Sequence, residues 1–175
     1  MLGSFGEIEI FSFHATKFIN ALEGGAVVTN DDNLANKVRL MKNFGFTNYD
    51  TTQLLGINGK MNEISAAMGI ANLALIDKFI SINKRNYNNY VRNLKDISGI
   101  SIIKYNTNEK CNYQYVVIEI DEEDVGISRD NILKILHAEG MLARKYFYPG
   151  CHLMEPYKTL YPSARAHLKK YGKTG

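Results

Sequence analysis

Cysteine is scarce in this sequence of 175 residues, and tryptophan is absent. The two cysteines, Cys111 and Cys151, lie far apart and match no spacing of a metal site. They therefore indicate reduced thiols rather than a disulfide framework, as is typical of cytoplasmic proteins. His152 follows Cys151 directly, but adjacent residues seldom converge on one ion, so we expect no metal.

The sequence also lacks a large excess of positive or negative charge. The formal net charge is +3, and the lysines and arginines are scattered along the chain. Because a nucleic-acid-binding surface needs a concentrated basic patch, we expect no nucleic-acid partner. With 45% hydrophobic and 22% charged residues, the composition is ordinary for a globular protein.

Long hydrophobic runs are missing as well. The most apolar stretch, residues 66–76, is interrupted by Asn72 and is too short to cross a bilayer. The first residues lack a basic segment followed by a long apolar run, which a signal peptide requires. We therefore expect a cytoplasmic protein without a membrane partner.

The first quarter of the sequence predicts two strands and a helix. Residues 7–13 alternate acidic and apolar positions before becoming wholly apolar, and residues 26–29 form a second short apolar run. Both segments are typical of strands. Residues 31–44 predict a helix, with apolar side chains on one face, acids at its start and basic residues later.

A long loop and two helices are predicted next. Residues 45–59 are rich in glycine and asparagine and predict an irregular loop, which is long for a purely structural connection. Asn62 is a predicted N-cap, and the expected buried stripe of its helix is Ile64, Met68, Ala71 and Leu75. A bend is expected near Asp77, after which the helical pattern continues to about Ile97.

The organisation changes after Gly99. Strands are predicted at residues 100–105 and 113–120, a helix at 128–139 and a strand at 141–147. This β-β-α-β order is typical of a small α+β unit packed against helices.

Lys17 is the residue that most strongly suggests chemistry. It stands in Ser12-Phe13-His14-Ala15-Thr16-Lys17, directly after a predicted strand. A lysine that condenses with an aldehyde must be uncharged part of the time, which a recessed site favours by desolvating the ammonium group. Ser12 and Thr16 supply short hydroxyl groups suited to an anion such as phosphate. The ordinary alternative is a solvated surface lysine.

Three segments together resemble the DegT/StrS group of sugar-nucleotide aminotransferases. The first is the Lys17 segment with Glu23-Gly24-Gly25-Ala26 behind it. The second is Gly56-Ile57-Asn58-Gly59-Lys60-Met61-Asn62-Glu63, and the third runs from Ala143 through Tyr148-Pro149-Gly150-Cys151-His152 to Tyr157. The form of the first segment is most similar to aminotransferases that act on dTDP-4-keto-6-deoxyglucose.

The resemblance implies an α/β fold of partial extent. Residues 1–75 would be a remnant of the large domain of a fold-type-I pyridoxal-phosphate transferase, with strands and long helices. Residues 76–175 would be a small α+β C-terminal domain, incomplete at its end. The implied activity is transamination of a nucleotide-linked keto sugar, with glutamate as amino donor, for surface-polysaccharide biosynthesis by a homodimer.

The resemblance also assigns roles to residues. Lys17 would hold pyridoxal 5'-phosphate covalently and move the proton, while Ser12 and Asn58 would contact the phosphate, Asn58 from the neighbouring subunit. His14 would lie beside the cofactor or at the edge of the core, and these alternatives stay open. Tyr148 and His152 are expected on the substrate side, although a strand residue is the alternative for Tyr148.

The sequence departs from the family in two respects. Lys60 stands where an arginine is usual, which keeps the charge but loses bidentate geometry. Family members are also about twice as long. The upstream half normally supplies the ring-stacking aromatic residue, the carboxylate at the pyridine nitrogen and a helix N-terminus for the phosphate.

We therefore expect a truncated form that alone binds the cofactor weakly and has little activity. The apolar faces at Phe11, Phe13, Val27 and Val28 are expected to lack partners, which predicts self-association or marginal solubility. The alternative function is a non-catalytic α/β interaction module in which Lys17 is incidental. A lysine-dependent aldolase is a third hypothesis, which the second and third segments do not support.

Overall fold

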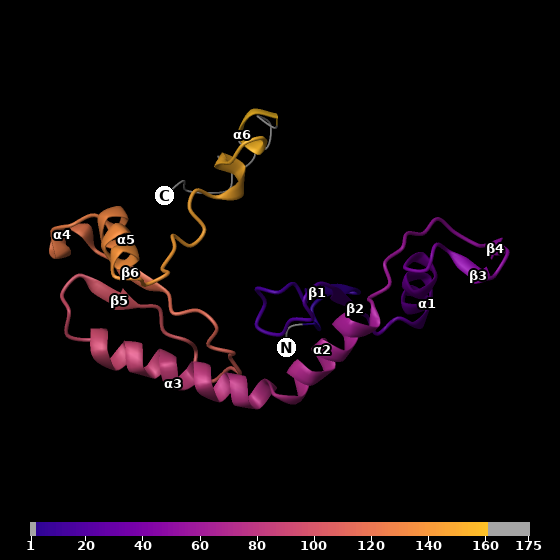
Figure 1. Ribbon diagram of the computed structural model, residues 1–175, viewed down its shortest axis with the longest axis horizontal. Coiled ribbons are helices and arrows are strands. Elements are labelled where there is room, and N and C mark those ends of the chain that lie inside the picture. The colour runs from indigo at the N-terminus through magenta and orange to yellow at the C-terminus, as the bar shows by residue number, and fades with distance from the viewer. Residues whose placement is uncertain (1–2, 161–175) are drawn as a thin grey trace. The chain divides into compact units, whose positions relative to one another are not determined.

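The computed structural model describes residues 3–160, whose helices and strands are labelled in Figure 1. The chain divides into two compact units. One unit contains the chain up to Asp96 together with Ile102–Ile118, and the other contains Ile97–Ser101 and the chain from Glu119. The predicted boundary at residues 75 and 76 stays a prediction. The expected incomplete end falls partly beyond residue 160, outside the described residues.

The first unit begins with an antiparallel pair of strands. Strand β1 (Glu9–Ser12) pairs with β2 (Gly25–Val28), so that Glu9 lies opposite Val28 and Ser12 lies opposite Gly25. Both predicted strands are confirmed: β1 is shorter than predicted, and β2 begins and ends one residue earlier than predicted. The Glu9 carboxylate accepts the backbone N–H of Phe5 and that of Gly3, each at 2.7 Å, and these bonds hold its pKa below the ordinary value.

Helix α1 (Asp32–Met41) starts where the sequence predicts. Asp31 is its N-cap, and the carboxylate accepts the N–H groups of Asn33 at 2.7 Å and Leu34 at 3.1 Å. The helix ends before the expected Phe44, which has a positive φ of 58°. That conformation cannot continue a right-handed helix.

The predicted irregular loop at residues 45–59 is wrong, because it contains a hairpin of β3 (Phe46–Asn48) and β4 (Thr51–Thr52). Two glycines permit it. A Cβ on Gly45 would overlap the carbonyl oxygen of Leu54, and a Cβ on Gly56 would lie 2.6 Å from the carbonyl oxygen of Met41. The glycines therefore serve close backbone approach rather than disorder.

Helices α2 (Glu63–Ala74) and α3 (Ile76–Leu94) follow. The predicted cap is confirmed, since the Asn62 side chain accepts the Ser65 N–H at 2.8 Å. The break falls at Leu75, two residues before the predicted bend. Among the described residues no single helix is long and apolar enough to cross a membrane, and α2 and α3 meet that criterion only as a pair bent by 61°.

The predicted buried stripe of α2 is wrong. Ile64 is 76% exposed, and Met68, Ala71 and Leu75 are also exposed. The face that packs inward carries small residues: Ser65 is buried, and a Cβ on Gly69 would lie 3.3 Å from the Cβ of buried Ala21. Close packing of small side chains against the β1–β2 loop therefore overrides the apolar pattern, and the bulky side chains remain outside.

An aromatic cluster joins the segment 103–117 to α3. It consists of Tyr87 on α3 with Tyr105 and Tyr113, whose ring centroids lie 4.9–5.5 Å apart. Tyr87 is 7% exposed, and its hydroxyl donates to the carbonyl oxygen of Ile103 at 3.2 Å. Burial raises the pKa of Tyr105 above its ordinary value. The cluster is an apolar anchor in which the hydroxyl groups of Tyr87 and Tyr105 donate to backbone carbonyl oxygens.

Strands β5 (Ile100–Ile102) and β6 (Ile118–Ile120) form a two-stranded sheet. Both predicted strands are confirmed in part, since each is shorter than expected. A short helix that the sequence did not predict follows, α4 (Glu122–Val125), capped by Asp121. The predicted helix is confirmed as α5 (Arg129–Ala138), with Ser128 as its N-cap.

The predicted strand at residues 141–147 is absent from the described chain. The backbone at the start of this segment is hydrogen-bonded to the last turn of α5 instead, since Met141 N donates to the carbonyl oxygen of Leu136 at 2.8 Å. The His137 ring also bonds the carbonyl oxygen of Ala143 at 2.6 Å. The remaining described elements are the 3-10 helix η1 (Cys151–Leu153) and α6 (Tyr157–Leu160).

Candidate active site

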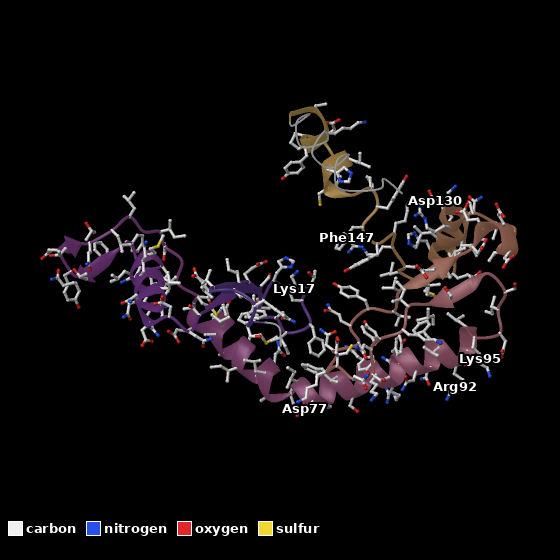
Figure 2. All side chains as sticks on the ribbon, turned by 180° about the vertical axis from the view of Figure 1, so that it is seen from behind. Lys17, Asp77, Arg92, Lys95, Asp130 and Phe147 are labelled. Atoms are coloured by element: carbon white, nitrogen blue, oxygen red, sulfur yellow. The ribbon has the colours of Figure 1, made fainter. Side chains whose placement is uncertain are left out.

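The loop between β1 and β2 carries Lys17 (Figure 2). The loop is closed by backbone hydrogen bonds from Phe13 N to the carbonyl oxygen of Gly24 at 2.8 Å and from Ala21 N to that of Phe13 at 2.9 Å. Within it, Lys17 N donates to the carbonyl oxygen of His14 at 2.9 Å, which closes a tight turn. The lysine thus stands on a defined backbone rather than a free loop.

The side chain of Lys17 is exposed in this structure. The sequence led us to expect a recessed amine, and the described chain does not supply that recess.

Ser12 and His14 lie in the same loop. Ser12 Oγ accepts the His14 N–H at 3.3 Å, which leaves the serine O–H to donate to an anion. The His14 ring bridges the loop: Nδ1 lies 3.0 Å from Thr16 Oγ1, and Nε2 lies 3.5 Å from a Glu23 carboxylate oxygen. The His14 side chain is 48% exposed, so it lies outside the core, and both ring nitrogens have a polar neighbour.

Three contacts fix this loop to the helices. Asn72 on α2 donates from Nδ2 to the carbonyl oxygen of Asn20 at 2.8 Å. Phe18 packs edge-on against Phe79 of α3, with 6.5 Å between ring centroids. The third contact is that of fully buried Ala21 with α2, where a Cβ on Gly69 would lie 3.3 Å from the Ala21 Cβ. The residues that follow Lys17 are therefore held by side chains from both helices.

Gln114 makes a fourth contact, which the sequence did not predict. Its Nε2 donates to the carbonyl oxygen of Thr16 at 3.1 Å, across 98 positions of sequence. No local pattern marks Gln114, because it stands in a segment that reads as an ordinary strand. Only its pairing with the Lys17 loop in three dimensions identifies it.

Asn58 lies in a rigid part of the same unit. It forms an isolated antiparallel bridge with Asn43. Its neighbours are bonded to the end of α1, with Ile57 N donating to Met41 O and Gly59 N to Lys42 O, each at 2.8 Å. The Asn58 side chain is exposed on this fixed backbone. Such rigidity suits a residue that contacts a ligand or a partner.

Lys60, the residue in place of the family's usual arginine, points its charge at an aromatic ring. Its Nζ lies 4.2 Å from the centroid of Phe44. The contact is a cation–π interaction, so the positive charge is retained beside the Asn58 segment.

Tyr148 and His152 belong to the second unit. The Tyr148 ring has two cations near its face, with the Arg129 guanidinium 4.7 Å and the Lys145 ammonium 5.4 Å from its centroid. Asp130 bonds both cations, at 2.9 Å to Arg129 and 3.0 Å to Lys145. His152 lies in η1, next to Gly150, and is exposed. The structure therefore brings Ser12, His14 and Lys17 together within the first unit, while Tyr148 and His152 lie in the second.

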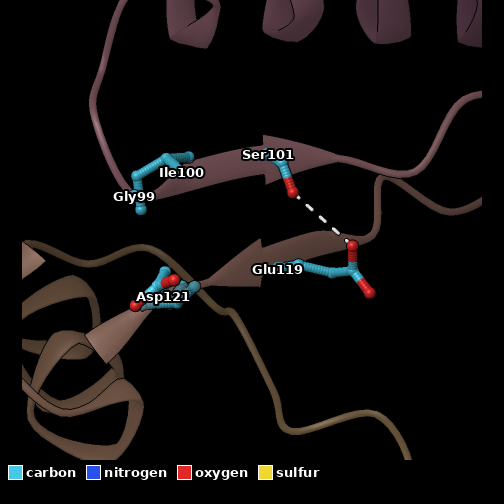
Figure 3. Close-up of a pocket in the computed structure, with 6 residues that line it drawn as sticks. Gly99, Ile100, Ser101, Glu119 and Asp121 are labelled. Atoms are coloured by element: carbon cyan, nitrogen blue, oxygen red, sulfur yellow. Dashed lines mark hydrogen bonds between the residues drawn. The ribbon is translucent and has the colours of Figure 1, made fainter. Parts of the chain in front are cut away.

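An open pocket of about 400 Å³ lies beside β5 and β6 and contains none of the predicted site residues (Figure 3). Its polar groups are already paired: Ser101 Oγ donates to a Glu119 carboxylate oxygen at 3.5 Å, and Asp121 caps α4. No group of three or more potential metal ligands occurs in the described part of the chain.

The donor set around Lys17 fits pyridoxal 5'-phosphate in its chemistry. The exposed primary amine is available to an aldehyde, and the Ser12 hydroxyl, at the end of β1, is available to a phosphate. The described residues of this loop include no carboxylate for a pyridine nitrogen other than Glu23, which is paired with His14. The described residues of this loop thus supply the amine and one phosphate donor of a cofactor site.

Comparison with known proteins supports this assignment. The model of the DegT/DnrJ/EryC1/StrS aminotransferase family matches residues 1–172. The chain belongs to this family, whose members are pyridoxal-phosphate-dependent aminotransferases. The resemblance inferred from the three segments is thereby confirmed.

Curated relatives of this chain include transaminases that are named for nucleotide sugars. The chain is 38% identical over 144 residues to dTDP-4-amino-4,6-dideoxy-D-glucose transaminase of Shigella dysenteriae, a match that covers 82% of the chain and 39% of the relative. This chain therefore spans about two fifths of that protein's length.

Solved structures show the same fold. A crystal structure of DesI in the presence of its TDP-sugar product superposes with a TM-score of 0.80 at 46% identity, covering 90% of this chain and 40% of that one. A more distant structure, an E. coli GDP-4-keto-6-deoxy-D-mannose-3-dehydratase with bound hydrated pyridoxal phosphate, shares the fold at 23% identity and a TM-score of 0.69. The predicted fold class, a partial fold-type-I transferase, is confirmed.

Proposed function

We propose that this chain is the lysine-bearing part of an aminotransferase that moves an amino group from glutamate to a nucleotide-linked keto sugar. The observation that carries the proposal is the Lys17 loop, whose backbone is closed on itself and fixed to both helices while its amine stays available. The relatives that make amino sugars on dTDP support a dTDP-4-keto-6-deoxy sugar as substrate. Such products serve surface-polysaccharide biosynthesis in the cytoplasm.

Each residue has a distinct part in this proposal. Lys17 would attach pyridoxal 5'-phosphate through its amine and, once released from it, act as the general base that takes the proton from the amino-bearing carbon of the donor. Ser12 would donate its O–H to the phosphate, and Asn58 would do so from the neighbouring subunit of a homodimer. When bound, the cofactor supplies an electron sink for the negative charge that develops. His14, which bonds Thr16 and Glu23, would keep the turn before Lys17 in shape, and Tyr148 and His152 would contact the sugar nucleotide.

The exposed apolar side chains of α2 support association with further protein. Ile64 and Ile70 are 76% and 70% exposed, and Leu73 is 51% exposed. A monomer seldom leaves so much of one helix uncovered. A second subunit, and the residues that longer relatives have in addition, would cover this surface and desolvate Lys17. The isolated chain would then bind the cofactor weakly and turn over little substrate.

Selective modification of Lys17 tests the proposal. The chain is incubated with excess pyridoxal 5'-phosphate, reduced with borohydride and mapped by peptide mass spectrometry. We expect Lys17 to carry a larger share of label than Lys37, a lysine on α1 that is also exposed. Equal labelling of the two lysines would refute the proposal.

The exposure of Lys17 favours a second candidate, the non-catalytic interaction module derived from the same fold. In that case Lys17→Arg would lose no more label than Lys37→Arg loses. Equal labelling in the experiment above would support this candidate.

A further inference from the structure

We propose that Gln114 is a positioning residue that sets the orientation of Lys17. The inference rests on the proposed function of Lys17 and extends it to a residue nearly a hundred positions away. Its basis is the hydrogen bond from Gln114 Nε2 to the carbonyl oxygen of Thr16, 3.1 Å long.

The bonded oxygen belongs to the peptide group that joins Thr16 to Lys17. The nitrogen of that same group donates to the carbonyl oxygen of His14 at 2.9 Å. Both polar ends of one planar unit are therefore held, one by the local turn and one by Gln114. Because a peptide group is rigid, holding its two ends fixes the position of the Lys17 Cα and of the N–Cα bond, and so limits the directions open to the Lys17 side chain.

Gln114 is itself held by a relay of amide groups. Asn83 on α3 donates from Nδ2 to the carbonyl oxygen of Asn112 at 3.1 Å. The Asn112 side chain accepts the N–H of Gln114, also at 3.1 Å. The relay runs from α3 through Asn112 to Gln114 and ends on the Lys17 loop, so the donor is anchored to the same helix that Phe18 contacts.

The backbone beside Gln114 is strained in a way that serves this arrangement. Tyr113 has a φ of 51°, a left-handed conformation that a side chain larger than asparagine seldom adopts. Its ring packs into the aromatic cluster, 5.5 Å from Tyr87 and 4.9 Å from Tyr105. The cluster compensates the strain, and the turn at Tyr113 leaves Gln114 free to bond the Lys17 loop.

Hydrogen exchange of the Lys17 amide is the first measurement. Gln114→Glu keeps the size of the side chain but removes its donor at pH 7, because a carboxylate only accepts. We expect protection of the Lys17 amide to fall about three- to tenfold, the effect of one net hydrogen bond. Asn88→Asp, the same amide-to-carboxylate change at an exposed site on α3, is the matched control and should leave protection unchanged. Amide protection within α3 checks that each variant is folded.

Rescue by protonation separates a specific bond from a general loss of packing. At pH 4, just below the ordinary glutamate pKa of about 4.3, the carboxyl group that Gln114→Glu introduces is about two thirds protonated and can then donate its O–H to the Thr16 carbonyl oxygen. Protection relative to the wild type at the same pH should then recover in Gln114→Glu and remain low in Gln114→Ala. No loss at pH 7, or equal behaviour of the two variants at both pH values, would overturn the inference.

Labelling with pyridoxal 5'-phosphate and borohydride connects the bond to the chemistry. We expect the Lys17 share of the label to fall about three- to tenfold in Gln114→Glu at pH 7 and to stay unchanged in Asn88→Asp. If Lys17 is selectively labelled in the wild type and equally in Gln114→Glu, the positioning role is refuted while the proposed function stands. If Lys17 is not selectively labelled in the wild type, the proposed function fails, and the inference fails with it.

Discussion

The terminal methyl carbon of Met61 lies where a side chain on Gly24 would begin. A Cβ on Gly24 would come within 2.5 Å of Met61 Cε, and Gly24 has a φ of +139°, which side chains rarely permit. Gly24 follows the Lys17 loop, and Met61 precedes α2. The contact therefore joins two of the three segments by which the family is identified, and it explains why a glycine stands at this position.

The first prediction concerns this contact. Gly24→Ala should lower the free energy of unfolding by about 1–3 kcal/mol, because the new methyl group meets Met61 and the backbone becomes strained. Urea denaturation measures the loss. Combining Gly24→Ala with Met61→Ala should recover part of it, and strict additivity of the two single changes would show that Met61 is not the cause.

A second prediction concerns the start of α2. Asn62→Ala should cost about 1 kcal/mol, because the Ser65 N–H loses its acceptor. Thermal unfolding followed by circular dichroism gives the change in stability. Asn62→Ser retains a capping oxygen and should lose much less. A serine variant as unstable as the alanine variant would contradict the capping role.

The third prediction concerns the aromatic cluster. Tyr87→Phe removes the hydroxyl that donates to the Ile103 carbonyl oxygen and should cost about 0.5–1.5 kcal/mol, since Tyr87 is buried. Tyr90, which is 42% exposed on the same helix, provides the control. Tyr90→Phe should change stability by less than about 0.5 kcal/mol, and denaturant titrations of both variants decide the matter.

The fourth prediction concerns acid stability. Lys145 and then Arg129 hold the pKa of Asp130 below its ordinary value of 3.8. A carboxyl group with a lower pKa in the folded state stabilises the fold above the unfolded value, and this contribution is lost as the pH falls through the folded pKa. Below about pH 4, Asp130→Asn should therefore show a weaker pH dependence of the melting temperature than the wild type. Parallel pH profiles for the two proteins would contradict this.

The sequence predicted those parts of the fold that depend on local signals. Asp31, Asn62 and Ser128 each cap the helix that follows, because short polar side chains bond backbone N–H groups wherever a helix begins. Strands β1 and β2 followed from apolar runs on either side of a glycine pair.

The parts of the fold and of the candidate site that the sequence did not predict depend on tertiary contacts. The inward face of α2 carries Ser65 and Gly69 because Ala21 approaches closely, and no periodicity of bulky side chains reveals this. The hairpin within residues 45–59 depends on the close backbone approach at Gly45 and Gly56. Composition alone predicts an irregular loop for a segment so rich in glycine and asparagine. For the candidate site, the sequence identified the Lys17 loop, but the bond from Gln114 joins positions too distant for any local pattern.

A second copy of this chain that covered the exposed isoleucines of α2 would make the stability of the chain depend on its concentration. Anything that binds the folded form and covers Ile64 and Ile70 adds a mass-action term to the free energy of folding. A melting temperature measured at one protein concentration would then reflect both the stability of the single chain and the extent of its association. The meaningful quantity is the slope of the melting temperature against the logarithm of total protein.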